Sequence, residues 1–132
     1  MSKINLDFAL ICEYASTDAS NKLSMMGNFN EVYGPSFPVV NNNFSLVVVW
    51  EGEAGAHKQL IKVIDEAGKS LGKPGLDWIT FKLEKDKFQQ IVNFPTGVLK
   101  FEKAGTYTIQ IFLDNENNLI KEIKLNAKQE GN

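Results

Sequence analysis

The C-terminal part of the chain alternates between apolar and polar residues with a period of two. Every second residue of 107–113 is apolar, and the pattern resumes over 119–127, interrupted only by Lys121. This period is typical of β-strands with one buried face. The Asn-rich residues 114–118 suit a turn, because asparagine tolerates the positive φ of tight loops. The sequence therefore predicts a β-hairpin with both apolar rows on one face and an odd-numbered loop of about three or five residues.

Strands are also predicted across most of the remaining chain. Residues 44–50 are apolar on both faces, as expected of a central strand covered on two sides. Other strands are expected at 4–15, 22–33, 57–65, 79–83, 88–94 and 98–101. Three inward rows are predicted. The strand at 4–15 has Leu6, Phe8, Leu10, Cys12 and Tyr14, the strand at 22–33 has Leu23, Met25 and Phe29, and the strand at 79–83 has Ile79, Phe81 and Leu83.

Prolines and glycines divide these strands. The two prolines of 34–38 remove ladder donors, and with the asparagines of 41–43 they predict a long connection that crosses between sheets. Pro74 and Gly75 predict another break. The stretch from Phe101 through Gly105 to Tyr107 resembles the corner of immunoglobulin-like sandwiches, where a glycine turn leads into a strand that opens with an inward tyrosine.

About eight short strands at intervals of roughly 8 to 15 residues predict an all-β fold. We expect a single-domain antiparallel β-sandwich with immunoglobulin-like, Greek-key connections, and a small β-barrel is the alternative. The domain is expected to cover residues 1–128, leaving a short polar tail at 129–132.

Composition narrows the classes of partner. The net charge of −2 gives no strong field, and all 14 basic residues are lysines, so the chain has no arginine for bidentate contacts with phosphates or guanines. We expect no nucleic-acid binding. No apolar stretch approaches the roughly 20 residues that span a membrane, no signal peptide is visible, and the single cysteine excludes an internal disulfide. A soluble cytoplasmic protein without membrane contact is expected.

Few residues offer reactive chemistry. Cys12 is in phase with apolar neighbours, which predicts a buried and inert thiol. His57 could serve an enzyme with help from nearby acids, but it is expected to lie on the surface. Carboxylates at Asp65, Glu66, Asp114 and Glu116 could bind calcium if their two turns met at one end of the sandwich. No zinc set can be built from one histidine and one cysteine, and no cofactor is indicated.

Three large apolar residues are expected on outer faces. Trp78 is out of phase with the inward row of its strand, and Phe112 and Ile120 are predicted to lie nearly opposite each other on the outside of the final hairpin. Together they could form a contact patch.

The chain also resembles a known family. The residues that carry the resemblance are Ala9 to Ala15, Lys22 to Phe29, Phe37-Pro38, Glu51 to Glu53, His57, Asp65 with Gly68, and the stretch from Phe101 to Tyr107. Over almost its whole length the chain is similar to a family of small bacterial proteins known only as a domain of unknown function. The resemblance implies a bacterial or phage source, and it brings no activity, cofactor or catalytic residue.

Titratable groups that could converge are scarce, so the sequence favours a non-enzymatic protein-interaction or scaffold module. Such a module would use an outer sheet face or an edge strand to bind a protein partner or a second copy of itself. A small-ligand or calcium-dependent binding domain that uses its end loops is the alternative. An enzyme centred on His57 is the third possibility.

Overall fold

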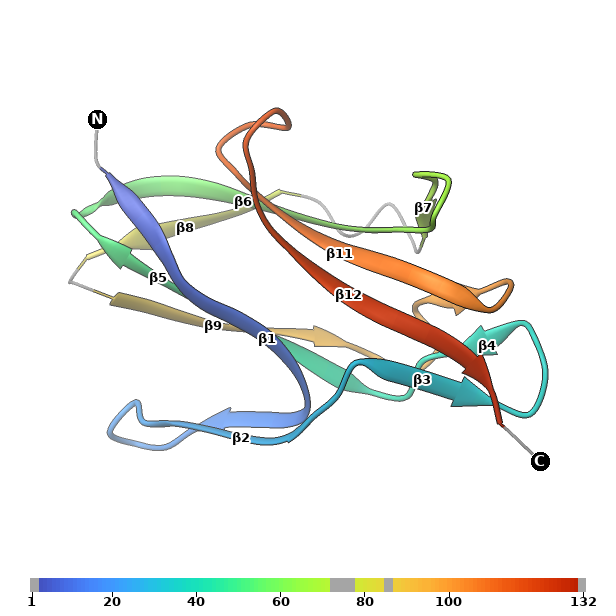
Figure 1. The fold of residues 1–132 in the computed structure, drawn as a ribbon. Helices are drawn as coiled ribbons and strands as arrows, with labels where there is room; N and C mark the ends of the chain where they lie inside the picture. Colours follow the sequence, from blue (N-terminus) through green and yellow to red (C-terminus); the bar gives the residue numbers. More distant parts are fainter. Residues whose placement is uncertain (1–2, 72–77, 85–86, 131–132) are drawn as a thin grey trace.

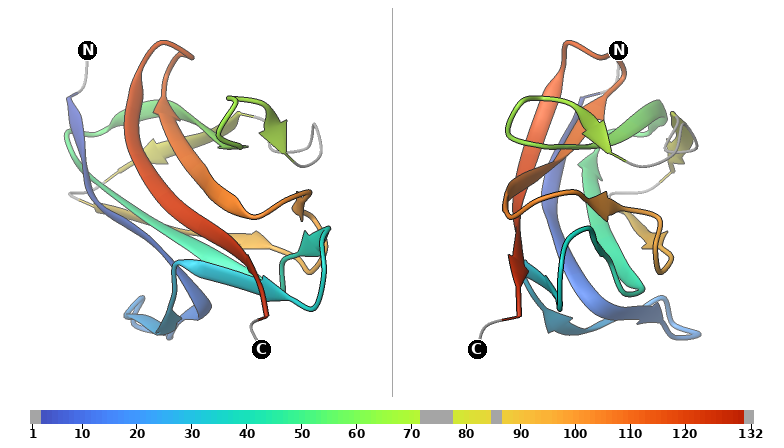
Figure 2. Two further views of the ribbon diagram at one scale, coloured as in Figure 1. Left: turned by 45° about the vertical axis from the view of Figure 1, so that its right-hand side comes forward. Right: turned by 90° about the vertical axis from the view of Figure 1, so that its right-hand side faces the viewer.

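Two β-sheets pack face to face, with their strands crossing at an angle (Figures 1 and 2). The computed structural model describes residues 3–71, 78–84 and 87–130, and within these ranges every regular element is a strand. The predicted break at Pro74 and Gly75 lies outside the described residues. The strands are β1 (Ile4–Thr17), β2 (Leu23–Asn28), β3 (Glu31–Gly34), β4 (Val39–Val40), β5 (Phe44–Gly52), β6 (Gly55–Ile64), β7 (Ser70–Leu71), β8 (Ile79–Leu83), β9 (Lys87–Phe94), β10 (Lys100–Phe101), β11 (Gly105–Leu113) and β12 (Leu119–Gln129).

The first layer is a four-stranded sheet in the order β2-β1-β5-β9. The second is a six-stranded sheet in the order β3-β12-β11-β6-β7, in which β8 also pairs with β6. β4 and β10 form a small sheet of their own. The described strands form a sandwich-like all-β fold rather than a closed barrel, which confirms the predicted class. One part of the prediction is wrong, because β3 runs parallel to β12.

The main core fills the space between the two layers. Its largest fully buried side chains include Trp50, Phe44, Phe94 and Phe101. The rings of Phe44 and Phe94 stack with centroids 4.7 Å apart, and those of Phe81 on β8 and Phe88 on β9 stack at 5.0 Å. The second contact joins the two sheets along one side of the sandwich.

A polar chain also crosses this core. The indole Nε1 of Trp50 on β5 donates to Oε1 of Gln59 on β6 at 2.8 Å, and Nε2 of Gln59 donates to Oε1 of Gln90 on β9 at 2.6 Å. Gln59 and Trp50 are both fully buried. The hydrogen bonds satisfy a buried indole N–H and a buried amide, whose desolvation would otherwise be costly.

A bulge in β1 changes which residues face the core. The register of β1 against β5 shifts between Leu6 and Phe8. Leu6 therefore packs on the main core, whereas Phe8, Leu10 and Cys12 lie on the outer face of the four-stranded sheet. The predicted single inward row is wrong, because an added residue exchanges the two faces of a strand.

The β1–β2 hairpin folds back over that outer face (Figure 1). Ala15 and Leu23 pack on a second, small cluster that contains Cys12, Val47 and Val49. In addition, Nε2 of Gln89 on β9 donates to the carbonyl of Asn21 at 2.9 Å. The buried state of Cys12 is confirmed, and the hairpin supplies the cover.

Tyr14 and Met26 form a cross-strand pair on the other side of this hairpin, and they are 57% and 68% exposed. Tyr14 was predicted to face inward. It faces solvent because Cys12 is the last residue of β1 that pairs with β5, and β1 then continues to Thr17 within the β1–β2 hairpin.

The predicted strand at 22–33 is in fact two strands in different sheets. β2 ends at Asn28 and β3 begins at Glu31, so the chain passes from the four-stranded to the six-stranded sheet over two residues, 29 and 30. The crossing at 34–43 contains the short β4, and the buried Asn41 anchors it. The Asn41 amide accepts a hydrogen bond from Leu99 N at 2.9 Å and donates one to Pro95 O at 3.0 Å.

The final hairpin has a loop of five residues at 114–118, one of the two odd lengths predicted, and Tyr107 and Ile109 pair with Leu125 and Ile123 on the core side. The Tyr107 hydroxyl donates to Lys103 O at 2.7 Å, which is the hydrogen bond that the predicted corner requires. β12 runs through Gln129.

Candidate functional site

A surface depression lies along β3. It is an open groove of about 370 Å³, and in Figure 1 β3 runs between the β1–β2 hairpin and β4. Its apolar lining comes from Phe29, Val32, Tyr33, Val40 and Phe44, and its polar lining from Glu13, Glu31, Asn42, Asn43 and Glu130. We call it the β3 groove.

β3 is an edge strand of the six-stranded sheet. It pairs with β12 on one side, and among the described strands no other ladder pairs with it. Edge strands present backbone N–H and C=O groups that another extended chain can use. Two apolar side chains flank this edge in exposed positions, with Tyr33 at 50% and Val40 at 48% exposure.

The groove is acidic. Its lining holds three glutamates and no lysine. Glu31 has local partners, since Lys128 Nζ and the Tyr33 hydroxyl both contact its carboxylate. The Lys128 ammonium, and after it the Tyr33 hydroxyl, hold the pKa of Glu31 below its usual value. Hydrogen bonding to the same carboxylate raises the pKa of Tyr33.

Backbone contacts fix where Glu13 and Glu130 stand. The Glu13 side chain lies across Gly27, where the positive φ of +76° and the close carboxylate leave no room for a Cβ. Glu130 N donates to Gly34 O at 2.7 Å, which extends the β3–β12 pairing beyond β12. Within the described part of the chain, neither carboxylate belongs to an ion pair.

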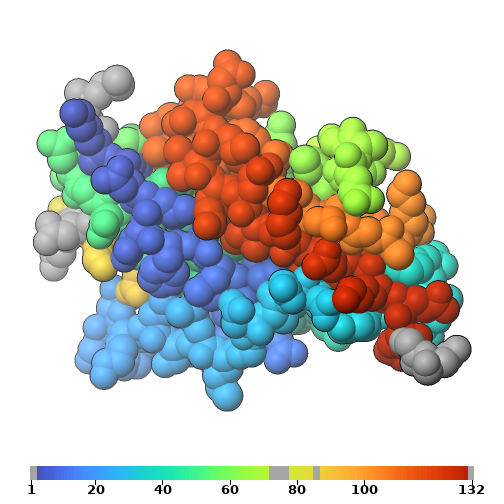
Figure 3. All heavy atoms as spheres, viewed as in Figure 1, coloured from blue at the N-terminus to red at the C-terminus, as the bar shows by residue number. Residues whose placement is uncertain are grey.

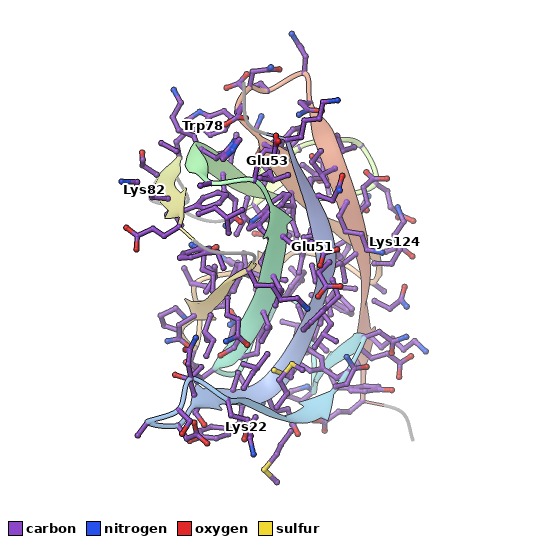
Figure 4. All side chains as sticks on the ribbon, turned by 90° about the vertical axis from the view of Figure 1, so that its left-hand side faces the viewer. Lys22, Glu51, Glu53, Trp78, Lys82 and Lys124 are labelled. Carbon is purple, nitrogen blue, oxygen red and sulfur yellow. The ribbon has the colours of Figure 1, made fainter. Side chains whose placement is uncertain are left out.

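The structure brings two of the three predicted patch residues to one face. Trp78 comes directly before β8, on the outer side of the six-stranded sheet, and Lys58 Nζ lies 5.8 Å from its ring centroid. Phe112 is on the same side, with Lys62 Nζ 5.4 Å from its ring. Leu60 pairs with Phe112 and lies outside both core clusters. Trp78 is partly buried, and Figure 4 shows Lys82 projecting away from the molecule.

Two corrections apply to this patch. Phe112 is only 7% exposed, so it offers little surface to a partner. Ile120 does not face it, because a bulge pairs Phe112 with Leu119. Ile120 is 37% exposed and instead lines a depression with residues 5–9 of β1, along the side where β1 and β12 adjoin (Figure 3).

His57 is buried, contrary to the prediction of a surface residue. Its Nδ1 lies 2.9 Å from Oδ2 of Asp114, and its ring is 5.9 Å from that of Phe81. Burial opposes ionisation of Asp114, but hydrogen bonds from the backbone of Lys58 and from His57 outweigh it and lower the pKa of the Asp114 carboxyl. The pair holds the β11–β12 loop against the start of β6.

Cys12 is remote from this pair, on the outer face of the other sheet. Burial raises the pKa of the Cys12 thiol, which favours the unreactive protonated form. The three depressions described here and below are lined by neither His57 nor Cys12.

The two acidic turns lie at opposite ends of the β6–β11 pair. Asp65 follows the end of β6 that pairs with Thr108, whereas Asp114 lies beside Lys58 at the other end. Seven residues of strand separate the two positions, or roughly 20 Å at about 3.3 Å per residue. The alternative of one calcium site that combines Asp65 and Glu66 with Asp114 and Glu116 therefore does not fit this arrangement. The described residues also contain no cluster of three or more potential metal-ligating side chains.

The geometry of the turn explains why an aspartate occupies position 65. Oδ1 of Asp65 accepts hydrogen bonds from the backbone of Ala67 and Lys69, both at 2.9 Å. A third depression, of about 230 Å³, adjoins this turn and is lined by Asp65, Lys69, Ser70, Leu71, Lys100, Glu102, Lys103 and Tyr107. Its charges of both signs do not define a ligand.

Sequence reasoning missed the β3 groove as a site. Its lining comes from residues 13, 29, 31–33, 40, 42–44 and 130, which are dispersed along the chain. The sequence contained one signal for it. Tyr33 and Val40 are apolar residues on either side of the proline-containing connection, and such residues often lie beside a sheet edge.

The fold and the groove define a small all-β protein of sandwich type with an open strand edge. Residues 7–128 match the family described as a family of unknown function (DUF6941), and the chain belongs to that family. The match confirms the resemblance inferred from the sequence. No curated protein matches the chain. Within the described ranges, no segment forms a helix long and apolar enough to cross a membrane.

Proposed function

We propose that this protein is a non-enzymatic interaction module that binds an extended segment of a partner protein along the edge of β3. One observation carries the proposal: an open, partly apolar groove of about 370 Å³ runs beside the strand edge that has no second ladder partner among the described strands. Addition of a strand to an exposed edge is a recurring mode of peptide recognition. Backbone hydrogen bonds supply affinity in this mode, and side-chain pockets supply selectivity.

The apolar residues around β3 support this use. Tyr33 and Val40 are half exposed on either side of the groove, while Phe29, Val32 and Phe44 form its more buried wall. Tyrosine contributes large contact area at a low cost in conformational entropy, and it is frequent at energetically important positions of interfaces. Similar exposure without an adjoining groove would carry much less weight.

The chemistry of the remaining sites favours binding over catalysis. The His57–Asp114 pair stabilises a loop from a buried position, and Cys12 lies beneath the folded-back hairpin. Catalytic groups normally converge on a cavity that can hold a substrate. The groove's own titratable groups are glutamates and Tyr33, with no nucleophile beside them.

We also propose that the fold is related to immunoglobulin-like sandwiches. The hydrogen bond from Tyr107 to Lys103 O, four residues earlier, supports it, because the same type of corner occurs in immunoglobulin-like sandwiches. In such folds binding commonly uses sheet faces, edges and end loops rather than the core.

The test compares two matched double variants in capture of partners from cells that naturally contain the protein. Tyr33→Ser with Val40→Thr alters the groove, and Tyr14→Ser with Met26→Thr alters an equally exposed apolar pair on the hairpin. We expect partners retained by the wild type and by the hairpin variant to be lost with the groove variant. Each anchor should contribute about 1–2 kcal/mol to binding.

The opposite pattern would refute the proposal that partners bind in the β3 groove. If the groove variant keeps every partner that the wild type captures, β3 is not the docking edge. If only a Trp78→Ser variant loses partners, binding uses the outer face of the six-stranded sheet, where Trp78 lies beside Lys58. Circular dichroism of each variant checks that it is folded.

A further inference from the structure

We propose that the partner segment bound in the β3 groove is basic, with apolar residues alternating with lysine or arginine. This inference rests on the proposed function and adds the chemistry of the partner. The strand edge explains why the ligand is an extended polypeptide. The distribution of charge around the groove explains why that polypeptide is basic.

The geometry of an added strand requires alternation. Successive side chains of an extended chain point to opposite sides, and β3 itself shows this with buried Val32 next to exposed Tyr33. One row of the partner's side chains would then meet the apolar wall that contains Phe29 and Phe44. β3 has four residues, so a matching partner strand is about four to six residues long.

The carboxylates of the groove select the sign of the partner's charge. Glu13 and Glu130 enter it from different elements, the β1–β2 hairpin and the end of the β12 segment. Both are exposed and neither forms an ion pair within the described ranges, whereas Lys128 already neutralises Glu31. A segment with Lys or Arg at suitable positions gains two charge contacts, and an acidic segment meets like charge.

Apart from Lys128, which pairs with Glu31, several lysines of the described ranges lie on another surface of the protein. Lys58, Lys62, Lys82 and Lys124 occupy outward positions on the six-stranded sheet, and Figure 4 shows Lys82 and Lys124 projecting from the surface. Lys58, Lys62 and Lys124 lie on β6 and β12, which are paired on both sides and cannot add to β3 of a second copy. β8 has one partner among the described strands, but it carries a single lysine, Lys82, for the two carboxylates. A separate basic peptide therefore fits the groove better than a second copy of this chain.

The experiment selects short random peptides, displayed on phage, against the wild-type protein, and then measures synthetic versions of the enriched peptides by fluorescence anisotropy at low and high salt. We expect enriched sequences to contain more Lys and Arg than Asp and Glu, in alternation with apolar residues. Their affinity should fall as salt increases, because exposed charge contacts are screened.

Charge-matched variants locate the contact. Glu13→Lys with Glu130→Lys should weaken binding of these peptides by about tenfold, since each rim contact contributes modestly and reversal adds repulsion. Glu84→Lys with Glu116→Lys changes the net charge equally at exposed positions outside the groove, and it should change affinity by less than about twofold. If the reversal unfolds the protein, Glu13→Gln with Glu130→Gln replaces it, with an expected loss of about threefold.

Several results would overturn the inference. Enrichment of neutral or acidic peptides, equal weakening by both lysine pairs, or no enrichment at all would each exclude a basic ligand for the groove. These failures are distinct from failure of the proposed function, which is decided by whether Tyr33→Ser with Val40→Thr loses natural partners. If the groove binds natural partners but not basic peptides, the protein is still an interaction module, but the partner segment is not basic. Concentration-dependent dimerisation that the Glu13→Lys/Glu130→Lys pair abolishes would likewise replace the peptide with a second copy.

Discussion

Replacing Gln59 with leucine should destabilise the fold even though it makes the core more apolar. Gln59 is the middle member of the polar chain that joins β5, β6 and β9. Leucine has a similar size, so Gln59→Leu leaves little empty space. The main consequence is that the Trp50 indole N–H loses its acceptor in a fully buried position.

The magnitude follows from this single unsatisfied donor. A buried polar group without a partner costs about 1–3 kcal/mol. Gln90 adds little, because its side chain is only partly buried and its amide can reach water. For a domain of this size, each kcal/mol corresponds to about 4 °C in Tm. We therefore expect Gln59→Leu to lower the Tm by about 4–12 °C.

A double-mutant cycle separates the hydrogen bond from other effects. Unfolding in urea, followed by circular dichroism, gives the free energy of unfolding for wild type, Gln59→Leu, Trp50→Phe and the double variant. Trp50→Phe alone leaves the Gln59 carbonyl oxygen unsatisfied, whereas the double variant removes both partners. The double variant should therefore lose about 1–2 kcal/mol less than the sum of the single losses. Additive losses, or an unchanged Tm for Gln59→Leu, would refute this explanation.

Three other expectations concern the corner, the loop and the thiol. Gly105→Val should lower the free energy of unfolding, measured in urea, by about 1–3 kcal/mol. The reason is that Gly105 has φ +153° and a Cβ there would lie 2.7 Å from Oε1 of Glu66. An unchanged urea midpoint would contradict the assignment of Gly105 to the turn. The lowered pKa of Asp114 means that its stabilising effect is present above the unfolded pKa near about 4 and is lost as pH falls through the folded value. Thermal scans should therefore show the stability advantage of wild type over Asp114→Asn shrinking as pH falls towards 3, and a constant difference would contradict the linkage. Cys12 should react with a thiol reagent much more slowly in the native protein than in denaturant, and equal rates would show that the hairpin does not cover it.

Local patterns predicted the regular parts of this fold. Alternation over 107–113 and 119–127 specified the final hairpin and its loop, and the apolar run of β5 specified the central strand. The tyrosine corner followed from the spacing of Gly105 and Tyr107. In each case neighbouring residues alone determine the outcome, because the period of a strand and the conformation of a turn are local properties.

Departures from regularity were not visible in the sequence. The bulge between Leu6 and Phe8 lies at Asp7, directly before the continuous apolar residues 8–12, and these residues fit either phase. The switch between sheets at 28–30 and the fold-back after Cys12 are set by tertiary packing. Gln59 resembles a surface residue until its partners on other strands are known.

The candidate site was less predictable than the fold. Trp78 was correctly placed outside the core, but the exposure of Phe112 and the position of Ile120 depended on a bulge and on lysine stems that cover the sheet. The β3 groove depends on Glu13 and Glu130, which are at opposite ends of the chain and become neighbours of one strand only after both sheets form.

The folded-back hairpin divides the molecule into two units of unequal stability. Beyond Cys12, β2 is the one described strand that pairs with β1, and a small apolar cluster together with the Gln89 contact to Asn21 holds the hairpin to the sheet. Detaching it exposes far less apolar surface than opening the sandwich, so it opens with a lower free energy. Reaction of Cys12 then measures hairpin opening rather than global unfolding. Because Glu13 lies in the same hairpin, each opening also removes one wall of the β3 groove.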